Sequence, residues 1–121
     1  MDCYEINVVT QRWTRGGFAI TATNKYYTET LREDNIAYIW RFISNNRLMA
    51  AKQKISFGTC FFLKKGTPYV TLYGDYKATP RDQFKAYCLK FEPKFELMQM
   101  TFTTPRDRVI TVSIAYRKGY Y

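Results

Sequence analysis

The tetrapeptide TPRD occurs twice, as residues 79–82 within KATPRDQFK and as residues 104–107 within FTTPRDRVI, and the predicted fold depends on it. Proline presets φ for the second position of a type I turn, and threonine or aspartate can hydrogen-bond the nearby backbone. Both copies stand between segments of strand length, so both are predicted to be turns. The residues around them do not match further, which argues against a repeat of whole units.

Five segments of strand length follow Arg47, and every break between them holds a proline. The segments are KISFGTCFFLKK, YVTLYGDYK, QFKAYCLKF, FELMQMTFT and RVITVSIAYRK. Strand-length runs separated by turn residues are typical of antiparallel hairpins in series. The pattern predicts a basic five-stranded antiparallel meander over residues 54–117.

The N-terminal segments CYEINVV and FAITAT both alternate polar and apolar residues with a period of two. They flank the loop TQRWTRGG, in which Gly16 and Gly17 can adopt positive φ. Alternation on both sides of a glycine-containing loop predicts a β-hairpin over residues 3–23.

The segment TLREDNIAYIWRFISNN predicts one α-helix over residues 31–45. Thr30 and Glu33 have the spacing of a capping box, in which each side chain satisfies a free backbone amide of the other residue. Apolar residues follow the spacing i, i+3, i+4, i+7, which forms one stripe along a helix. They are Ile36, Ile39, Trp40 and Ile43.

These elements predict one α+β domain over residues 1–121, with an N-terminal β-hairpin, one α-helix and the five-stranded antiparallel meander curved around the helix. A length of 121 residues fits one domain, and 46% hydrophobic residues can supply its core. Charge is distributed unevenly. Residues 1–46 carry five basic and five acidic residues, so the whole net charge of +9 lies in residues 47–121. Such an excess favours polyanions or acidic proteins as partners.

The predicted binding site follows from the meander, because alternate turns of a meander lie at the same end of the sheet. Arg81 and Arg106 then share one rim, about 10 Å apart, and Tyr69 and Tyr73 lie on the face between the two rims. Lys64, Lys65 and Lys94 belong to the opposite rim. The predicted site residues are Arg81, Arg106, Arg108, Lys77, Lys64, Lys65, Lys94, Tyr69, Tyr73 and Arg117.

Aromatic side chains between basic rims favour binding of nucleic acid, with single-stranded DNA or RNA preferred, because bases stack on rings while cations bind phosphates. A first alternative is a protein-interaction module or inhibitor, of the viral or phage accessory type, that grips an acidic surface of a nucleic-acid-handling protein. A second alternative is a ligand-binding α+β roll whose core aromatics line a pocket.

The sequence does not predict an enzyme, because it contains no histidine and no recognisable catalytic motif. The remaining enzymatic alternative is a histidine-free nuclease that uses basic residues with Asp82 or Asp107. No cofactor and no metal site is predicted. Cys3, Cys60 and Cys88 lack CxxC spacing and are predicted to be reduced, mostly buried thiols.

The chain is predicted to be intracellular and cytoplasmic, with no membrane partner. No run approaches the ~20 apolar residues of a membrane span, and MDCYEINVV lacks the features of a signal peptide. Edge strands such as CYEINVV or RVITVSIAY would allow a homodimer by pairing across a two-fold axis.

Overall fold

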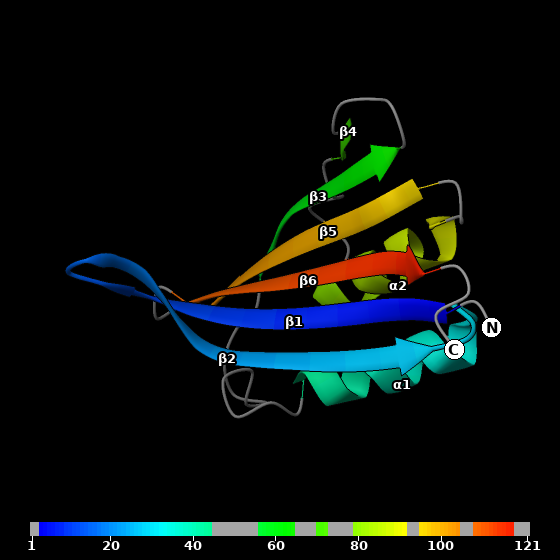
Figure 1. Ribbon diagram of the computed structural model, residues 1–121, viewed down its shortest axis with the longest axis horizontal. Helices are drawn as coiled ribbons and strands as arrows, with labels where there is room; N and C mark the ends of the chain where they lie inside the picture. The colour runs from blue at the N-terminus through cyan, green and yellow to red at the C-terminus, as the bar shows by residue number, and fades with distance from the viewer. Residues whose placement is uncertain are drawn as a thin grey trace.

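A sheet and two helices form the two layers of the molecule (Figure 1). The computed structural model describes residues 3–44, 56–64, 70–72, 79–91, 95–104 and 108–117. Within these residues, six strands pair antiparallel in the order β2-β1-β6-β5-β3-β4. The strands are β1 (Cys3–Thr14), β2 (Gly17–Thr28), β3 (Ser56–Lys64), β4 (Val70–Leu72), β5 (Phe95–Thr104) and β6 (Arg108–Arg117), and the helices are α1 (Glu33–Ser44) and α2 (Pro80–Lys90).

The predicted α+β class is confirmed, and an N-terminal antiparallel pair is present but longer than predicted. β1 and β2 pair from Tyr4 with Thr28 to Thr14 with Gly17, so the hairpin runs beyond residue 23. Gly17 has a φ of 109°, a conformation that glycine adopts without steric cost. The Thr14 hydroxyl donates to the Gly17 carbonyl oxygen at 2.6 Å and closes the turn.

The prediction of a single helix and a five-stranded meander is wrong, because the segment predicted as the strand QFKAYCLKF forms α2. Thr79 is the N-cap of this helix, with φ −71° and ψ 156°, and Pro80 follows at the start of the helix. The Thr79 hydroxyl oxygen accepts a hydrogen bond from the Asp82 backbone N–H at 3.1 Å. The first TPRD is therefore a helix start rather than a β-turn.

The hydrophobic spacing after the first TPRD explains the second helix. Phe84, Tyr87, Cys88 and Phe91 are all buried and follow the spacing i, i+3, i+4, i+7. The second TPRD begins at Thr104, the last residue of β5, and residues 105–107 lie outside the described residues. The same tetrapeptide thus begins a helix at one site and lies between two strands at the other.

The two copies of TPRD give a matched stability prediction. Thr79→Val removes the N-cap oxygen and should lower the free energy of unfolding by about 1 kcal/mol. Thr104→Val should be neutral or slightly stabilising, because the Thr104 hydroxyl is buried and has no hydrogen-bond partner among the described residues. Urea denaturation of both variants measures the difference, and equal losses would contradict the assignment of Thr79 as the N-cap.

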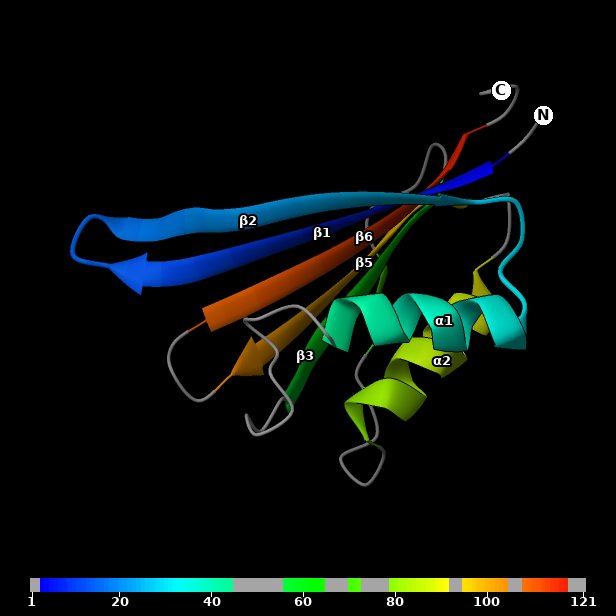
Figure 2. The same cartoon turned by 90° about the horizontal axis from the view of Figure 1, so that it is seen from below.

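The core lies between the sheet and the two helices, which cover the same face of the sheet (Figure 2). β6 shows the alternation, because Ile110, Val112 and Ile114 are buried whereas Thr111 and Ser113 are partly exposed. The uncovered face of β6 carries Val109, Thr111, Ser113, Ala115 and Arg117.

α1 begins at Glu33, two residues later than predicted. The first helical hydrogen bond runs from the Ile36 N–H to the Arg32 carbonyl oxygen at 2.9 Å, so Thr30 lies too far upstream to act as the N-cap. Glu33 instead forms an ion pair with Lys85 of α2, and this contact lowers the pKa of the Glu33 carboxyl group. The prediction of a Thr30–Glu33 capping box is therefore wrong.

The strands proposed for edge-to-edge dimer pairing lie inside the sheet. β1, which contains CYEINVV, has β2 and β6 as neighbours, and β6, which contains RVITVSIAY, has β1 and β5. Neither has a free edge along its paired length, so the prediction that they are edge strands is wrong. The long edge strand of the described sheet is β2.

All three cysteines are free and buried, as predicted. Burial raises the pKa of the Cys60 thiol to about 12 and raises the pKa of Cys88 well above its usual value. The thiolate is the reactive form, and its fraction at pH 8 falls from about one in four at an ordinary pKa to about 10⁻⁴ at a pKa near 12.

We therefore expect iodoacetamide to modify Cys60 at pH 8 at least about a thousandfold more slowly in the native protein than in urea. Site-resolved mass spectrometry of time-quenched samples measures both rates. Comparable rates in the two conditions would show that Cys60 is exposed to solvent in the native state.

Candidate functional site

The paired strands β1 and β2 extend beyond the rest of the sheet (Figure 1). β1 pairs with β6 only as far as Arg12, whereas its pairing with β2 continues to Thr14. The register shifts between Thr10 and Gln11, where an irregularity allows the strand to change direction. The part of the hairpin from Gln11 to Ile20 is called the arm below.

The arm exposes large apolar side chains. Trp13 and Phe18 are cross-strand partners, with ring centroids 5.0 Å apart and ring planes at 79°. This edge-to-face contact orients the two rings but leaves Trp13 56% exposed and Phe18 52% exposed. Ile20 is 65% exposed. Grouped exposed apolar side chains mark interaction sites in soluble proteins.

Two arginines face each other where the arm leaves the sheet. Arg12 of β1 and Arg108 of β6 are direct cross-strand partners. Like charges at such positions lie about 4.5–5.5 Å apart at Cβ and repel each other. Neither arginine forms an ion pair with a carboxylate of the described residues. A bound anion would neutralise this repulsion.

The residues in and around the arm add further positive charge to that of Arg12 and Arg108. Residues 6–28 contain Arg12, Arg15 and Lys25 and no acidic residue. Arg15 lies in the exposed turn at the tip of the arm, between the ends of β1 and β2. The arm therefore combines exposed aromatic rings with positive charge alone.

A cleft of about 380 Å³ lies where the arm meets the ends of β5 and β6. Its lining consists of Trp13, Phe18, Thr103, Thr104, Arg108 and Val109. Thr104 is only 8% exposed, and its hydroxyl has no hydrogen-bond partner among the described residues. The cleft thus offers an aromatic wall, a cation and a free hydroxyl to one ligand.

This arrangement suits a flat group that is linked to an anion. A group in the cleft can stack on Trp13 or Phe18 while Arg108 binds the anion, and Thr104 can donate or accept one hydrogen bond. Arg12 adds a second positive charge as the cross-strand partner of Arg108. We refer to the arm and this cleft together as the arm site.

The structure places the predicted site residues Arg81 and Arg108 in different clefts, and Arg106, the predicted rim partner of Arg81, lies outside the described residues. Arg108 lies in the arm site, but Arg81 lines a different cleft of about 580 Å³ between α1 and α2. Carboxylates of Glu33, Asp34 and Asp82 line this second cleft. The rim prediction is wrong because it required residues 83–91 to form a strand.

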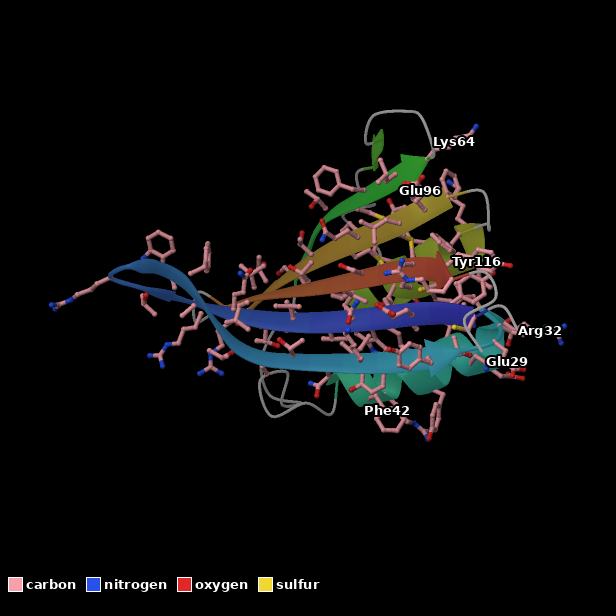
Figure 3. The ribbon with its side chains drawn as sticks, in the orientation of Figure 1. Glu29, Arg32, Phe42, Lys64, Glu96 and Tyr116 are labelled. Carbon is pink, nitrogen blue, oxygen red and sulfur yellow. The ribbon has the colours of Figure 1, made fainter. Side chains whose placement is uncertain are left out.

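The other predicted basic residues that the structure describes lie far from the arm. Lys64 is at the end of β3 opposite the arm (Figure 3), and Arg117 is at the far end of β6 from Arg108. A nitrogen of Arg117 lies 3.7 Å from a Glu5 carboxylate oxygen. The remaining predicted residues lie outside the described residues, and they are Lys65, Tyr69, Tyr73, Lys77, Lys94 and Arg106.

Sequence reasoning missed the arm because it treated TQRWTRGG as a loop. The strands instead continue through this segment, so Arg12, Trp13 and Phe18 hold fixed cross-strand positions. A signal was present in RWTRGGF, where two arginines precede a glycine pair and an aromatic residue stands on each side of it. Such a composition is typical of a binding hairpin as well as of a loop.

The nuclease alternative gains no support from the described residues. Asp82 is exposed in the first turn of α2, where a negative charge stabilises the helix, and Asp107 lies outside the described residues. Among the described residues, no three His, Cys, Asp or Glu side chains gather in a way that could hold a metal ion. No helix in the described part is long and apolar enough to cross a membrane.

The chain was compared with protein-family models, with curated proteins and with solved structures, and none of them matches it. Its function is therefore inferred from the site alone.

Proposed function

We propose that the protein binds nucleic acid, with single strands favoured, through the arm site. The observation that carries the proposal is the cleft in which Arg108, the cross-strand partner of Arg12, lies with the exposed rings of Trp13 and Phe18. Nucleic acid supplies both groups that this arrangement suits, because each nucleotide joins an anionic phosphate to a flat base.

Single strands are favoured because the faces of their bases are accessible. In a duplex, neighbouring base pairs cover these faces, whereas an unpaired base can stack on Trp13 from within the cleft. Stacking of this kind contributes about 1–3 kcal/mol per base and depends little on base identity. We therefore expect weak sequence preference and a clear preference for unpaired strands.

An acidic protein surface is the second candidate partner, and Ile20 is the observation that favours it. This side chain is 65% exposed and aliphatic, so it offers apolar surface without a face for stacking. An acidic partner would use the same arginines, and the experiment below distinguishes the two candidates.

Fluorescence anisotropy with labelled oligothymidylate and a labelled duplex tests the proposal. We expect binding to the single strand at about 50 mM salt, and an affinity about twentyfold lower at 200 mM if Arg12, Arg15 and Arg108 each contact a phosphate. Absence of binding at the lower salt concentration would contradict the proposal and turn attention to an acidic protein.

We also propose an intracellular location. Support comes from Cys3, Cys60 and Cys88, which all remain free thiols.

A further inference from the structure

A second group of exposed aromatic side chains lies along α1 and the end of β2 that is remote from the arm. Tyr38 is 60% exposed and Phe42 is 44% exposed. The Phe42 ring lies 4.8 Å from that of Tyr38 and 5.6 Å from that of Tyr26, measured between centroids. Figure 3 shows Phe42 at the outer margin of α1. This group forms a continuous aromatic surface.

The charges of this surface differ from those of the arm. α1 has Glu33 and Asp34 in its first turn and Arg41 in its last turn. A surface with both signs of charge repels phosphates as well as attracting them, so it suits a protein better than a nucleic acid. A helix with acidic and basic ends is complementary to a second copy of itself that runs antiparallel.

A hollow beside Ala37 fits such a second copy. It has a volume of about 440 Å³ and lies on the exposed side of α1 next to Tyr38. Ala37 is exposed and small, so it allows another helix to approach closely. The lining consists of Asp34, Ala37, Tyr38, Trp40, Arg41 and Arg81.

The spacing of these residues is symmetric about the middle of α1. Asp34 lies three residues before Ala37, and Arg41 lies three residues after Tyr38. If two helices cross antiparallel about a two-fold axis between Ala37 and Tyr38, each Tyr38 faces Ala37 of the second copy. Each Asp34 then faces Arg41 of the second copy, so opposite charges lie together at both ends of the contact.

We propose that two copies of this chain associate through α1, with Tyr38 of each copy seated in the hollow beside Ala37 of the other. The contact is small, because α1 has 12 residues and is therefore only about 18 Å long. Stable interfaces bury about 800 Å² per partner, so we expect a contact confined to this helix to give a weak dimer.

The edge of β2 is a poorer site for a second copy. Lys25 is the one charged residue in β2. It pairs with Asn7, in the part of β1 that also pairs with β6. A lysine on an edge strand opposes pairing with another strand, because the charge must remain solvated. The proposal therefore places the contact on α1.

Sedimentation velocity of the full chain without nucleic acid tests the proposal over about a hundredfold range of micromolar concentrations. The weight-average mass should rise from 14.4 kDa toward twice that value. Ala37→Arg fills the hollow, and it should weaken association at least about tenfold, which is the effect of losing about 1.4 kcal/mol. Ala37 is exposed, and arginine is a good helix former, so this variant keeps the fold.

Charge reversal gives a sharper second test. Asp34→Arg and Arg41→Asp should each weaken the dimer, and the double variant should restore it, because the exchanged charges again face each other. Leu89→Ala on α2 is the control, since it removes another exposed apolar side chain and should not affect association. Circular dichroism confirms the helix content of each variant.

A mass of 14.4 kDa at every concentration would overturn the proposal. So would a dimer that is equally strong in wild type, Ala37→Arg and Tyr38→Ala. The experiment contains no nucleic acid, so its outcome is independent of the function proposed for the arm site.

Discussion

Phe102→Ala is expected to lower the free energy of unfolding by about 3–5 kcal/mol, which is a large part of the stability of a domain of this size. Phe102 is completely buried in β5, between β3 and β6. Its ring centroid lies 5.6 Å from those of both Trp40 in α1 and Phe57 in β3. Removing the ring leaves a cavity where the sheet meets the helix layer.

Urea denaturation followed by circular dichroism measures this loss. Thr103→Ala is the matched control, because Thr103 is the next residue in β5 and points to the uncovered face, where it is exposed. We expect the control to change the free energy of unfolding by no more than about 0.5 kcal/mol. Equal losses in the two variants would mean that the assigned register of β5 is wrong.

The double variant Arg12→Gln/Arg108→Gln is expected to lower the affinity for oligothymidylate about fiftyfold at about 50 mM salt. The slope of log K against log salt should become less steep by about 1.4, because two phosphate contacts to a single strand are lost. Stability should be unchanged or higher, because the substitution removes two like charges that face each other across β1 and β6.

This combination of weaker binding and undiminished stability distinguishes a binding role from a structural one. Arg117→Gln is the control, since Arg117 lies at the opposite end of β6 and has Glu5 as a neighbouring charge. It should leave both the affinity and the salt slope close to those of wild type. An Arg12/Arg108 variant that bound normally, or that bound weakly only because it unfolded, would contradict the assignment of the arm site.

The part of the fold that was predictable from the sequence depends on strong periodicity. The segment RVITVSIAYRK was predicted as a strand, and in β6 the residues Ile110, Val112 and Ile114 alternate on the one face of the sheet that the helices cover. The apolar stripe of α1 likewise predicted the burial of Ile36, Ile39 and Ile43. The sequence distinguished helix from strand wherever the spacing of apolar residues fitted only one of the two periods.

The first TPRD shows why the second helix, α2, was not predicted. Threonine followed by proline suits a type I turn and equally suits the start of a helix, where proline lacks only an N–H that would be unpaired. The residues that follow decide between the two. Phe84, Tyr87, Cys88 and Phe91 have helical spacing, whereas Ile110, Val112 and Ile114 after the second copy alternate as in a strand.

The candidate site was less predictable than the fold because it depends on strand pairing between distant segments. Arg108 was predicted as a site residue, but its proximity to Arg12 requires β1 to lie next to β6. The alternation of residues within a strand does not specify its neighbours in the sheet, since β1 and β6 both alternate with a period of two. The wrong assignment of α2 also moved Arg81 to a sheet rim, although it lies among carboxylates between the helices.

Trp13 fluorescence tests the central claim, that a base stacks in the arm site, most directly. The chain has two tryptophans, and Trp40→Phe leaves Trp13 as the single indole while keeping an aromatic ring against Phe84 and Phe102. Titration of this variant with oligothymidylate should quench the Trp13 emission in parallel with the rise in anisotropy of the labelled strand. Binding that leaves Trp13 emission unchanged would contradict stacking in the arm site and would place the nucleic acid elsewhere on the protein.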